Sequence, residues 1–198
     1  MPTGVALPDA RQRLFDAAER ILLRDGPNAL TSRAVTVEAG CAKGVLHRHF
    51  ADFDAFLAGL VRDRIARIDE QAGALRASAG TGTVTGNLAG ALTKLFESVA
   101  VAIVALVTFR DELRARLRQA GSAGIPLLTE ATAMIASYLT AEREAGRVAA
   151  DADVGTLAPT LIGAAHLLFA DRENAPPDPE AVRRTVATVV AGAVRESR

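Results

Sequence analysis

Basic side chains gather in one short stretch near the N-terminus, where their types suit contacts with phosphate. Residues 31–50 include Arg33, Lys43 and Arg48 but only one carboxylate, Glu38. Guanidinium and ammonium groups form charge-assisted hydrogen bonds with phosphate oxygens, and proteins position themselves on a nucleic-acid backbone through such contacts. The sequence therefore predicts a phosphate-binding surface here, with an ordinary solvated face as the alternative.

Two short helices are expected to hold these side chains. Thr31 is a good N-cap, because its hydroxyl can accept a hydrogen bond from a free N–H of the first helical turn. Leu30 and Val35 stand at the two positions of a hydrophobic staple. We expect this helix to cover residues 32–39 and to end at Gly40, which can adopt the left-handed conformation.

A tight turn at residues 41–42 then leads to a second helix, expected from Lys43 to about His49. Val45 or Leu46 is expected to point inward. The side chains expected to point outward are those of Lys43, His47, Arg48 and His49. Two short helices joined by a turn that contains Gly form the helix-turn-helix unit, whose second helix enters the major groove of DNA.

The order of apolar, glycine and aromatic positions in this region matches a known pattern. The matching positions are Thr31, Val35, Ala39, Gly40, Lys43, Gly44, Leu46, His49, Phe50 and residues 52–57. Residues 10–60 resemble the N-terminal domain of TetR-family transcriptional regulators. The resemblance implies an all-α protein with an N-terminal three-helix helix-turn-helix DNA-binding domain at residues 1–51. A larger C-terminal helical domain at residues 52–198 would bind an effector and dimerise.

The expected partner of the first domain is a double-stranded DNA operator. The residues predicted to contact it are Thr31, Ser32, Arg33, Lys43, Gly44, Val45, His47, Arg48 and His49. The two histidines can contact bases or phosphates, and the alternative for His49 is packing beside Phe50.

Four positions depart from the family pattern, and each alters a phosphate contact. Ala42 replaces a capping Ser or Thr, Val45 replaces a Thr, His47 replaces a Tyr, and Phe53 replaces a Lys. These departures keep a second interpretation open, in which an all-α dimer binds small molecules or proteins and has lost DNA binding.

Net charge, cysteine content and the length of apolar runs indicate the kind of protein and the compartment to expect. The chain has 198 residues, 49% of them hydrophobic, and 23 basic residues balance 23 acidic ones, so nucleic acid must be attracted by a local patch. A single cysteine, Cys41, excludes an internal disulfide and suits a reducing cytoplasm; we favour a buried thiol over a redox sensor. The longest apolar run, residues 99–107, is too short to span a bilayer. We expect a cytoplasmic protein without a membrane segment.

Helical periodicity extends over the rest of the chain. The expected segments are a helix at residues 10–25, a long helix after Asp52, a loop at 78–86, a helix carrying Leu92 to Leu106, a helix at 110–120, a helix from Pro126 to near Gly146, a helix opening at Asp151 or Asp153, and a last helix starting at residues 178–180. Pro159 implies either a start near Thr156 or a kink.

Apolar residues cover two sides of the helix expected at residues 157–169, so two sides must be buried. One side can face the core of the chain and the other a second copy, in a four-helix interface with the last helix. The predicted interface residues are Leu157, Leu161, Ala164, Leu168, Val182, Val186, Val189, Val190 and Val194. The alternative is that both sides form the core of a monomer.

The middle helices bring apolar and aromatic residues together with a few polar groups, which is typical of a small-molecule pocket. The predicted lining is Phe96, Ile103, Phe109, Arg110, Met134, Tyr138, His166 and Phe169, with Tyr138, His166 and Arg110 as polar anchors. The alternative is that these residues form only core.

No phosphate-binding loop, nucleophile elbow, zinc motif or pair of catalytic carboxylates is present in the sequence. We therefore expect no enzyme activity, no metal and no cofactor. The sequence predicts a homodimeric regulator, a repressor that a small-molecule effector releases from its operator. A lyase or hydrolase on a helical scaffold is a distant alternative.

Overall fold

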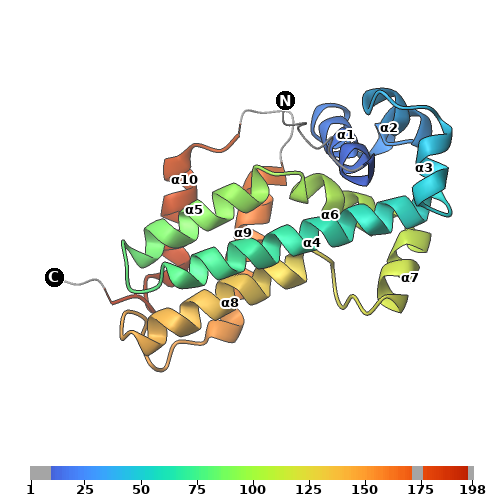
Figure 1. Cartoon of the computed structure of the whole chain (residues 1–198). Helices are drawn as coiled ribbons and strands as arrows, with labels where there is room; N and C mark the ends of the chain where they lie inside the picture. The colour runs from blue at the N-terminus through green and yellow to red at the C-terminus, as the bar shows by residue number, and fades with distance from the viewer. Residues whose placement is uncertain (1–9, 171–175, 196–198) are drawn as a thin grey trace, which may run out of the picture.

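The computed structural model describes residues 10–170 and 176–195, and within these ranges the secondary structure is helical apart from one isolated β-bridge (Figure 1). The helices are α1 (Ala10–Asp25), the 3-10 turn η1 (Pro27–Ala29), α2 (Ser32–Glu38), α3 (Gly44–His49), α4 (Phe53–Ala77), α5 (Val84–Phe96), α6 (Ala100–Phe109), α7 (Asp111–Gln119), α8 (Leu128–Glu144), α9 (Val154–Ala170) and α10 (Pro179–Val190). The prediction of an all-α protein with an N-terminal helix-turn-helix is confirmed.

Helices α1, α2 and α3 form a small head, which lies at the N-terminal end of α4 (Figure 1). Its core is aromatic: the ring centroids of Phe15 and Phe50 lie 5.8 Å apart, and Phe56 of α4 lies 5.6 Å from Phe15 and 5.2 Å from Phe50. Gly59 of α4 makes room for this cluster, because a Cβ there would lie 3.0 Å from the Phe50 ring. The first turns of α4 thus belong to the core of the head.

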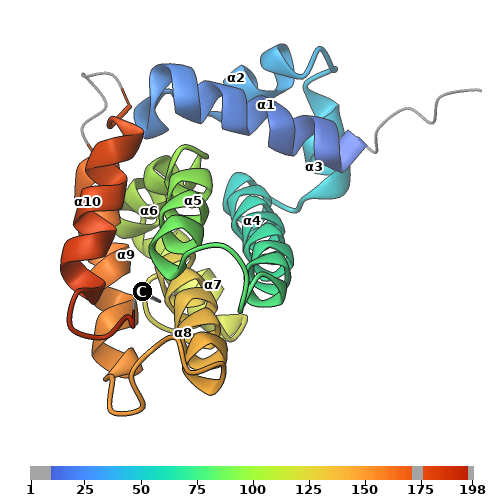
Figure 2. The same cartoon turned by 90° about the vertical axis from the view of Figure 1, so that its left-hand side faces the viewer.

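The remaining helices form a larger bundle around α4, and α1 lies across one end of it (Figure 2). Helix α4 packs against α8, α5 against α10, and α8 against α9. The buried side chains of this bundle are mostly Leu, Val, Ile and Ala, and Tyr138 is its largest fully buried residue. One long helix, α4, therefore connects the aromatic core of the head with the aliphatic core of the bundle.

Capping side chains set several helix starts where the sequence predicts them. The hydroxyl of Thr31 accepts a hydrogen bond from the N–H of Ala34 at 3.1 Å, and the carboxylate of Asp52 accepts one from Ala55 at 2.6 Å. Before α10, the Asp178 carboxylate accepts from Glu180 at 3.1 Å. The predicted starts at Ser32, after Asp52 and around Pro179 are confirmed.

Other boundaries differ from the sequence predictions. The loop predicted at residues 78–86 ends early, because Thr83 caps α5 by accepting from the N–H of Gly86 at 3.0 Å. The apolar segment that carries Leu92 to Leu106 is not one helix: it breaks after Phe96 and bends by 56°.

Of two later helix starts, one differs from its prediction and one agrees with it. Helix α8 begins at Leu128 rather than Pro126, because Leu127 adopts a positive φ of 71° that interrupts the helix. Helix α9 starts at Val154, directly after Asp153, which is one of the two predicted openings; it includes Pro159, and the alternative start near Thr156 is not observed. Asp153 supports this start by accepting a hydrogen bond from the N–H of Thr156 at 3.1 Å.

In the described part of the chain, no single helix is both long and apolar enough to cross a membrane. The bent pair α5 and α6 meets that test of length and composition only when the two are taken together, and many of their side chains belong to the core of the bundle.

Candidate nucleic-acid interface

Helix α3 is a short helix with one buried anchor and an exposed outer side. Its residue Leu46 is fully buried in the core of the head, and Val45 is partly buried against the same core. Gly40 has a φ of 61°, which turns the chain sharply after α2, and the N–H of Cys41 donates to the carbonyl of Thr36 at 3.0 Å. The turn and the burial of Leu46 fix α3 against α1 and α2 while its polar side chains stay in solvent.

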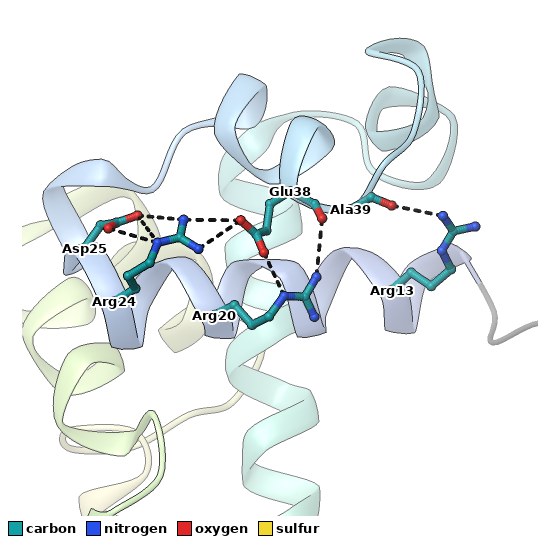
Figure 3. A network of polar contacts seen from close by, with 6 residues as sticks. All are labelled: Arg13, Arg20, Arg24, Asp25, Glu38 and Ala39. Atoms are coloured by element: carbon teal, nitrogen blue, oxygen red, sulfur yellow. Dashed lines mark hydrogen bonds and ion pairs between the residues drawn. The ribbon is translucent and has the colours of Figure 1, made fainter.

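Three arginines of α1 hold the C-terminal end of α2 (Figure 3). Arg13 donates to the carbonyl of Ala39 at 2.9 Å, and Arg20 donates to the Glu38 carboxylate at 2.8 Å and to its carbonyl at 3.3 Å. Arg24 reaches the same carboxylate at 3.2 Å. Because the last carbonyls of a helix lack intrahelical partners, Arg13 and Arg20 cap α2, and all three arginines fix its angle to α1.

The same contacts compensate the negative charge of Glu38, the only carboxylate of residues 31–50. Hydrogen bonds from Arg20 and then Arg24 lower the pKa of Glu38, so it stays ionised and paired. The cations of α2 and α3 are left without an opposing charge: Arg33, Lys43 and Arg48 form no ion pair with any described residue. The exposed side of the head is therefore a locally positive surface on a chain of zero formal net charge.

Seven of the nine residues predicted to contact DNA are exposed, and two are half-buried. Those exposed are Thr31, Arg33, Lys43, Gly44, His47, Arg48 and His49; those half-buried are Ser32 and Val45. Phe50 is buried and His49 is not, so the structure does not support packing of His49 into the aromatic cluster. Cys41 is half-buried with a free thiol.

The sequence prediction missed the three α1 arginines. Their spacing of seven and four residues places them on one face of a helix, a signal that was present in the sequence. Their acceptors lie far along the chain, so only the folded head reveals the pairing.

The eight residues predicted to line an effector pocket differ in their burial. Phe96, Ile103, Met134, Tyr138 and Phe169 are buried, while Arg110 and His166 are half-buried. Phe109 is 85% exposed at the end of α6, so its placement in an interior lining needs correction. Four cavities found among the described residues are lined by none of the eight.

The three predicted polar anchors are engaged elsewhere. Tyr138 donates to Glu142 at 2.6 Å and accepts from Asn87 at 3.0 Å, and burial raises the pKa of the Tyr138 hydroxyl. His166 stacks on Phe96 with ring centroids 5.9 Å apart, and burial lowers the pKa of the His166 imidazole. The remaining anchor, Arg110, forms an ion pair with an aspartate of α4.

Four of the nine predicted interface residues lie inside the chain itself. Leu161, Val182, Val186 and Val190 are each 1% exposed, because α9 and α10 turn these side chains toward α5, α8 and each other. A second copy cannot reach them, so these four positions need correction. The remaining five, Leu157, Ala164, Leu168, Val189 and Val194, are half-buried.

No group of three or more His, Cys, Asp or Glu side chains that could hold a metal ion is found within residues 10–170 and 176–195.

Comparison with known proteins supports the interpretation of the head. Residues 14–59, which run from α1 into α4, match the family model of the bacterial regulatory proteins of the tetR family. No curated protein matches the sequence. The matched segment contains the whole helix-turn-helix, so the head has the fold of the DNA-binding domain of this family.

The whole chain is similar in fold to solved structures. A member of the TetR family from Streptomyces coelicolor matches with a TM-score of 0.64 and 21% identity, over 92% of this chain and 98% of that chain. The transcriptional regulator FadR from Bacillus subtilis, in complex with stearoyl-CoA, matches with a TM-score of 0.66 and 16% identity, over 91% and 98%. A gamma-butyrolactone receptor, an ArpA-like protein, matches with a TM-score of 0.62 and 19% identity, over 93% and 88%. The N-terminal segment thus matches the tetR family model, and the whole chain shares the fold of these solved TetR-family structures.

Proposed function

We propose that this regulator is a homodimeric, ligand-responsive repressor that binds a DNA operator through α2 and α3 and leaves it when a small molecule binds. The observation that carries the proposal is the exposed α3 helix, with Lys43 and Arg48 unpaired and the neighbouring Glu38 neutralised. Phosphate contacts of this kind set the register of a helix in the major groove. All nine predicted contact residues are kept, with His47 and His49 as candidates for base or phosphate contacts.

The proposed boundary between the DNA-binding domain, residues 1–51, and the effector-binding and dimerisation domain, residues 52–198, falls in the turn between α3 and α4. The first turn of α4 is also tied to the bundle through α7. Arg116 forms an ion pair with Asp52 at 2.9 Å, and Arg110 forms one with Asp54 at 3.0 Å. A change in the position of α7 would therefore reach the head directly. The coupling needed is of order 1–3 kcal/mol and reciprocal between DNA and effector.

The solvent-exposed side of α9 supports the proposed dimer. The helix contains no Asp, Glu, Lys or Arg, yet one side of it is exposed, including Leu167 at 79%. Four of its exposed residues step by four, three and four along the helix: Thr156, Thr160, Gly163 and Leu167. An uncharged stripe of this kind costs little to desolvate. We propose that a second copy packs there in a symmetric four-helix contact with α10.

A small-molecule effector is supported by the relatives. FadR from Bacillus subtilis was solved in complex with stearoyl-CoA, and another protein of this fold is a gamma-butyrolactone receptor. The proposed pocket among the middle helices must open when a ligand enters, because its predicted lining is largely buried core.

A binding titration against salt tests the DNA contact. We expect the chain to retard the DNA that flanks its own gene, and Lys43→Ala to weaken operator and nonspecific binding alike. The log–log salt dependence should become shallower by about one unit for each phosphate that the variant no longer neutralises. Arg118→Ala, at an exposed position of α7, is the matched control and should leave the slope unchanged.

An unchanged slope in Lys43→Ala would refute the role of that residue. Failure to retard any DNA even at low salt would favour the alternative, an all-α dimer that binds small molecules or proteins and has lost DNA binding.

Sedimentation tests the dimer surface. Leu167→Glu places a charge in the proposed interface, where it would be desolvated without a partner, so we expect a monomer. Ile125→Glu is the control, since Ile125 is 48% exposed and lies before α8, away from the stripe. A Leu167→Glu protein that sediments as the wild type would rule out this surface.

A further inference from the structure

A groove of about 750 Å³, the largest of the four cavities described, lies at the end of the bundle where α4 passes into α5. Its walls are the turn between α4 and α5, Arg147, α10 and the segment that follows α10. Helix α4 has 25 residues, so its two ends lie about 37 Å apart at the usual rise per residue. The groove is thus remote from α3, and it does not overlap the predicted pocket among the middle helices.

Four guanidinium groups line this groove. They belong to Arg147, Arg183, Arg184 and Arg195, and the only carboxylate in the lining is that of Glu180. Glu180 lies 3.8 Å from Arg183 on the surface, a weak pair, whereas the side chains of Arg184 and Arg195 form no ion pair with any described residue. Even with the buried Glu142 counted against Arg147, an excess of two positive charges remains.

Arg147 is held in place before any ligand arrives. It forms an ion pair with Glu142 at 3.2 Å and donates to the carbonyl of Gly82 at 2.9 Å. Glu142 is fully buried and also accepts hydrogen bonds from Tyr138 at 2.6 Å and from the N–H of Gly80 at 3.3 Å. A guanidinium has five N–H donors, so Arg147 retains donors for an anion.

The segment after α10 is also fixed to the wall. The N–H of Arg195 donates to the carbonyl of Arg147 at 2.9 Å, and the N–H of Ala149 donates to Ala193 at 2.7 Å. Arg195 and Arg147 are therefore kept side by side by backbone hydrogen bonds. A site assembled in advance loses less conformational entropy when it binds a ligand.

We propose that this groove binds a small organic anion that carries at least two negative charges on phosphate or carboxylate groups. Guanidinium groups pair with both in a bidentate geometry, and the volume lies in the usual range for small-molecule sites. An apolar ligand would instead desolvate these arginines without giving them partners, which is costly. This proposal names a class of ligand beyond the proposed function. Binding of the anion does not depend on that function, but an effect of the anion on DNA binding would.

Calorimetric titration of the full chain without DNA tests the site. The probes are pyrophosphate, ATP and citrate, with adenosine as an uncharged comparison. We expect at least one of the anions to bind and adenosine not to bind. We expect Arg183→Gln and Arg195→Gln each to lose about tenfold in affinity, because each removes a positive charge from the groove. This factor corresponds to about 1.4 kcal/mol. Preference for pyrophosphate and ATP would identify a phosphate ligand, and preference for citrate a polycarboxylate.

Two control variants separate this groove from other basic surfaces. Arg118→Gln removes an exposed arginine of α7, and Lys43→Ala removes a cation of α3; both should bind the anions as the wild type does. Absence of binding by all three anions at millimolar concentration, or equal affinities in wild type and both groove variants, would overturn the proposal. Both groove residues are exposed, so thermal melting of the variants should match the wild type and exclude unfolding as the cause of a loss.

The same proteins distinguish a failure of the groove from a failure of the DNA-binding proposal. A chain that binds DNA but none of the anions would overturn the groove alone. A chain that binds the anions through Arg183 and Arg195 but no DNA would support the groove and overturn the repressor.

Discussion

A glutamate pairs with arginine near each end of α4, with two arginines at the head and one at the other end, and the two glutamates lie in different surroundings. At the head, Glu38 pairs with Arg20 and Arg24 at the surface, with 22% of its side chain exposed. At the other end, Glu142 pairs with Arg147 and is fully buried. Exposed ion pairs contribute little to stability, whereas breaking a buried one is expensive. The same residue types therefore fix a helix angle at one end and support the wall of a groove at the other.

Shape also separates the two positive surfaces. Lys43 and Arg48 project from a single short helix, which suits the groove of a duplex. The arginines of the anion groove line a concavity, which suits a small ligand. Lys43 and Arg48 have no carboxylate partner among the described residues, whereas the groove combines the unpaired Arg184 and Arg195 with Arg147 and Arg183, which also contact a glutamate.

The largest effect on stability is expected from Glu142→Leu. The substitution leaves the half-buried Arg147 without its carboxylate and removes the acceptor of the Tyr138 hydroxyl, so we expect a loss of about 3 kcal/mol in the free energy of unfolding. Urea denaturation measures it. Glu144→Leu, two residues along the same helix and exposed, should change the free energy by less than about 0.5 kcal/mol. Equal losses of unfolding free energy in the two variants would show that the contacts of Glu142 with Arg147 and Tyr138 do not stabilise the fold.

A second comparison tests the packing at the head end against the other half of the same helix. Gly59→Ala places a Cβ 3.0 Å from the Phe50 ring and 3.2 Å from the Phe15 ring, and overpacking of this kind costs about 1–3 kcal/mol. Gly73→Ala meets nothing within 4 Å, so it should instead stabilise α4 by up to about 1 kcal/mol through helix propensity. Opposite shifts of the urea midpoint are expected, and two shifts of the same sign would contradict the tight aromatic core.

The helix-turn-helix could be predicted nearly residue by residue because its signals are local. Thr31 caps α2, Leu30 and Val35 are both buried, and Gly40 turns the chain with a positive φ. The break between α5 and α6 could not be predicted in this way, since residues 97–99 contain no Gly or Pro and packing against other helices decides.

The two candidate sites also differ in whether local sequence signals could predict them. The exposed residues of α3 follow from helical spacing within one segment. The anion groove brings together Arg147, Arg183 and Arg195 from segments that are distant in sequence, and Tyr138 was predicted to line a pocket although it supports Glu142. Sequence periodicity identifies the face of a helix but not the helix that covers it.

The smallest effect is expected from Glu38→Gln, and it should depend on pH. Pairing with Arg20 and Arg24 lowers the pKa of Glu38 in the folded chain. Its contribution to stability is therefore present above the pKa of the unfolded state, about 4.3, and is lost as the pH falls through the lower folded value. The wild type should be more stable than Glu38→Gln at pH 7, and the difference should shrink toward pH 3. Urea unfolding at both pH values measures it, with Glu70→Gln, an exposed residue of α4, as the control. A difference that stays constant between pH 7 and pH 3 would mean that the charge of Glu38 does not hold α2, and that its two arginines support the head by packing alone.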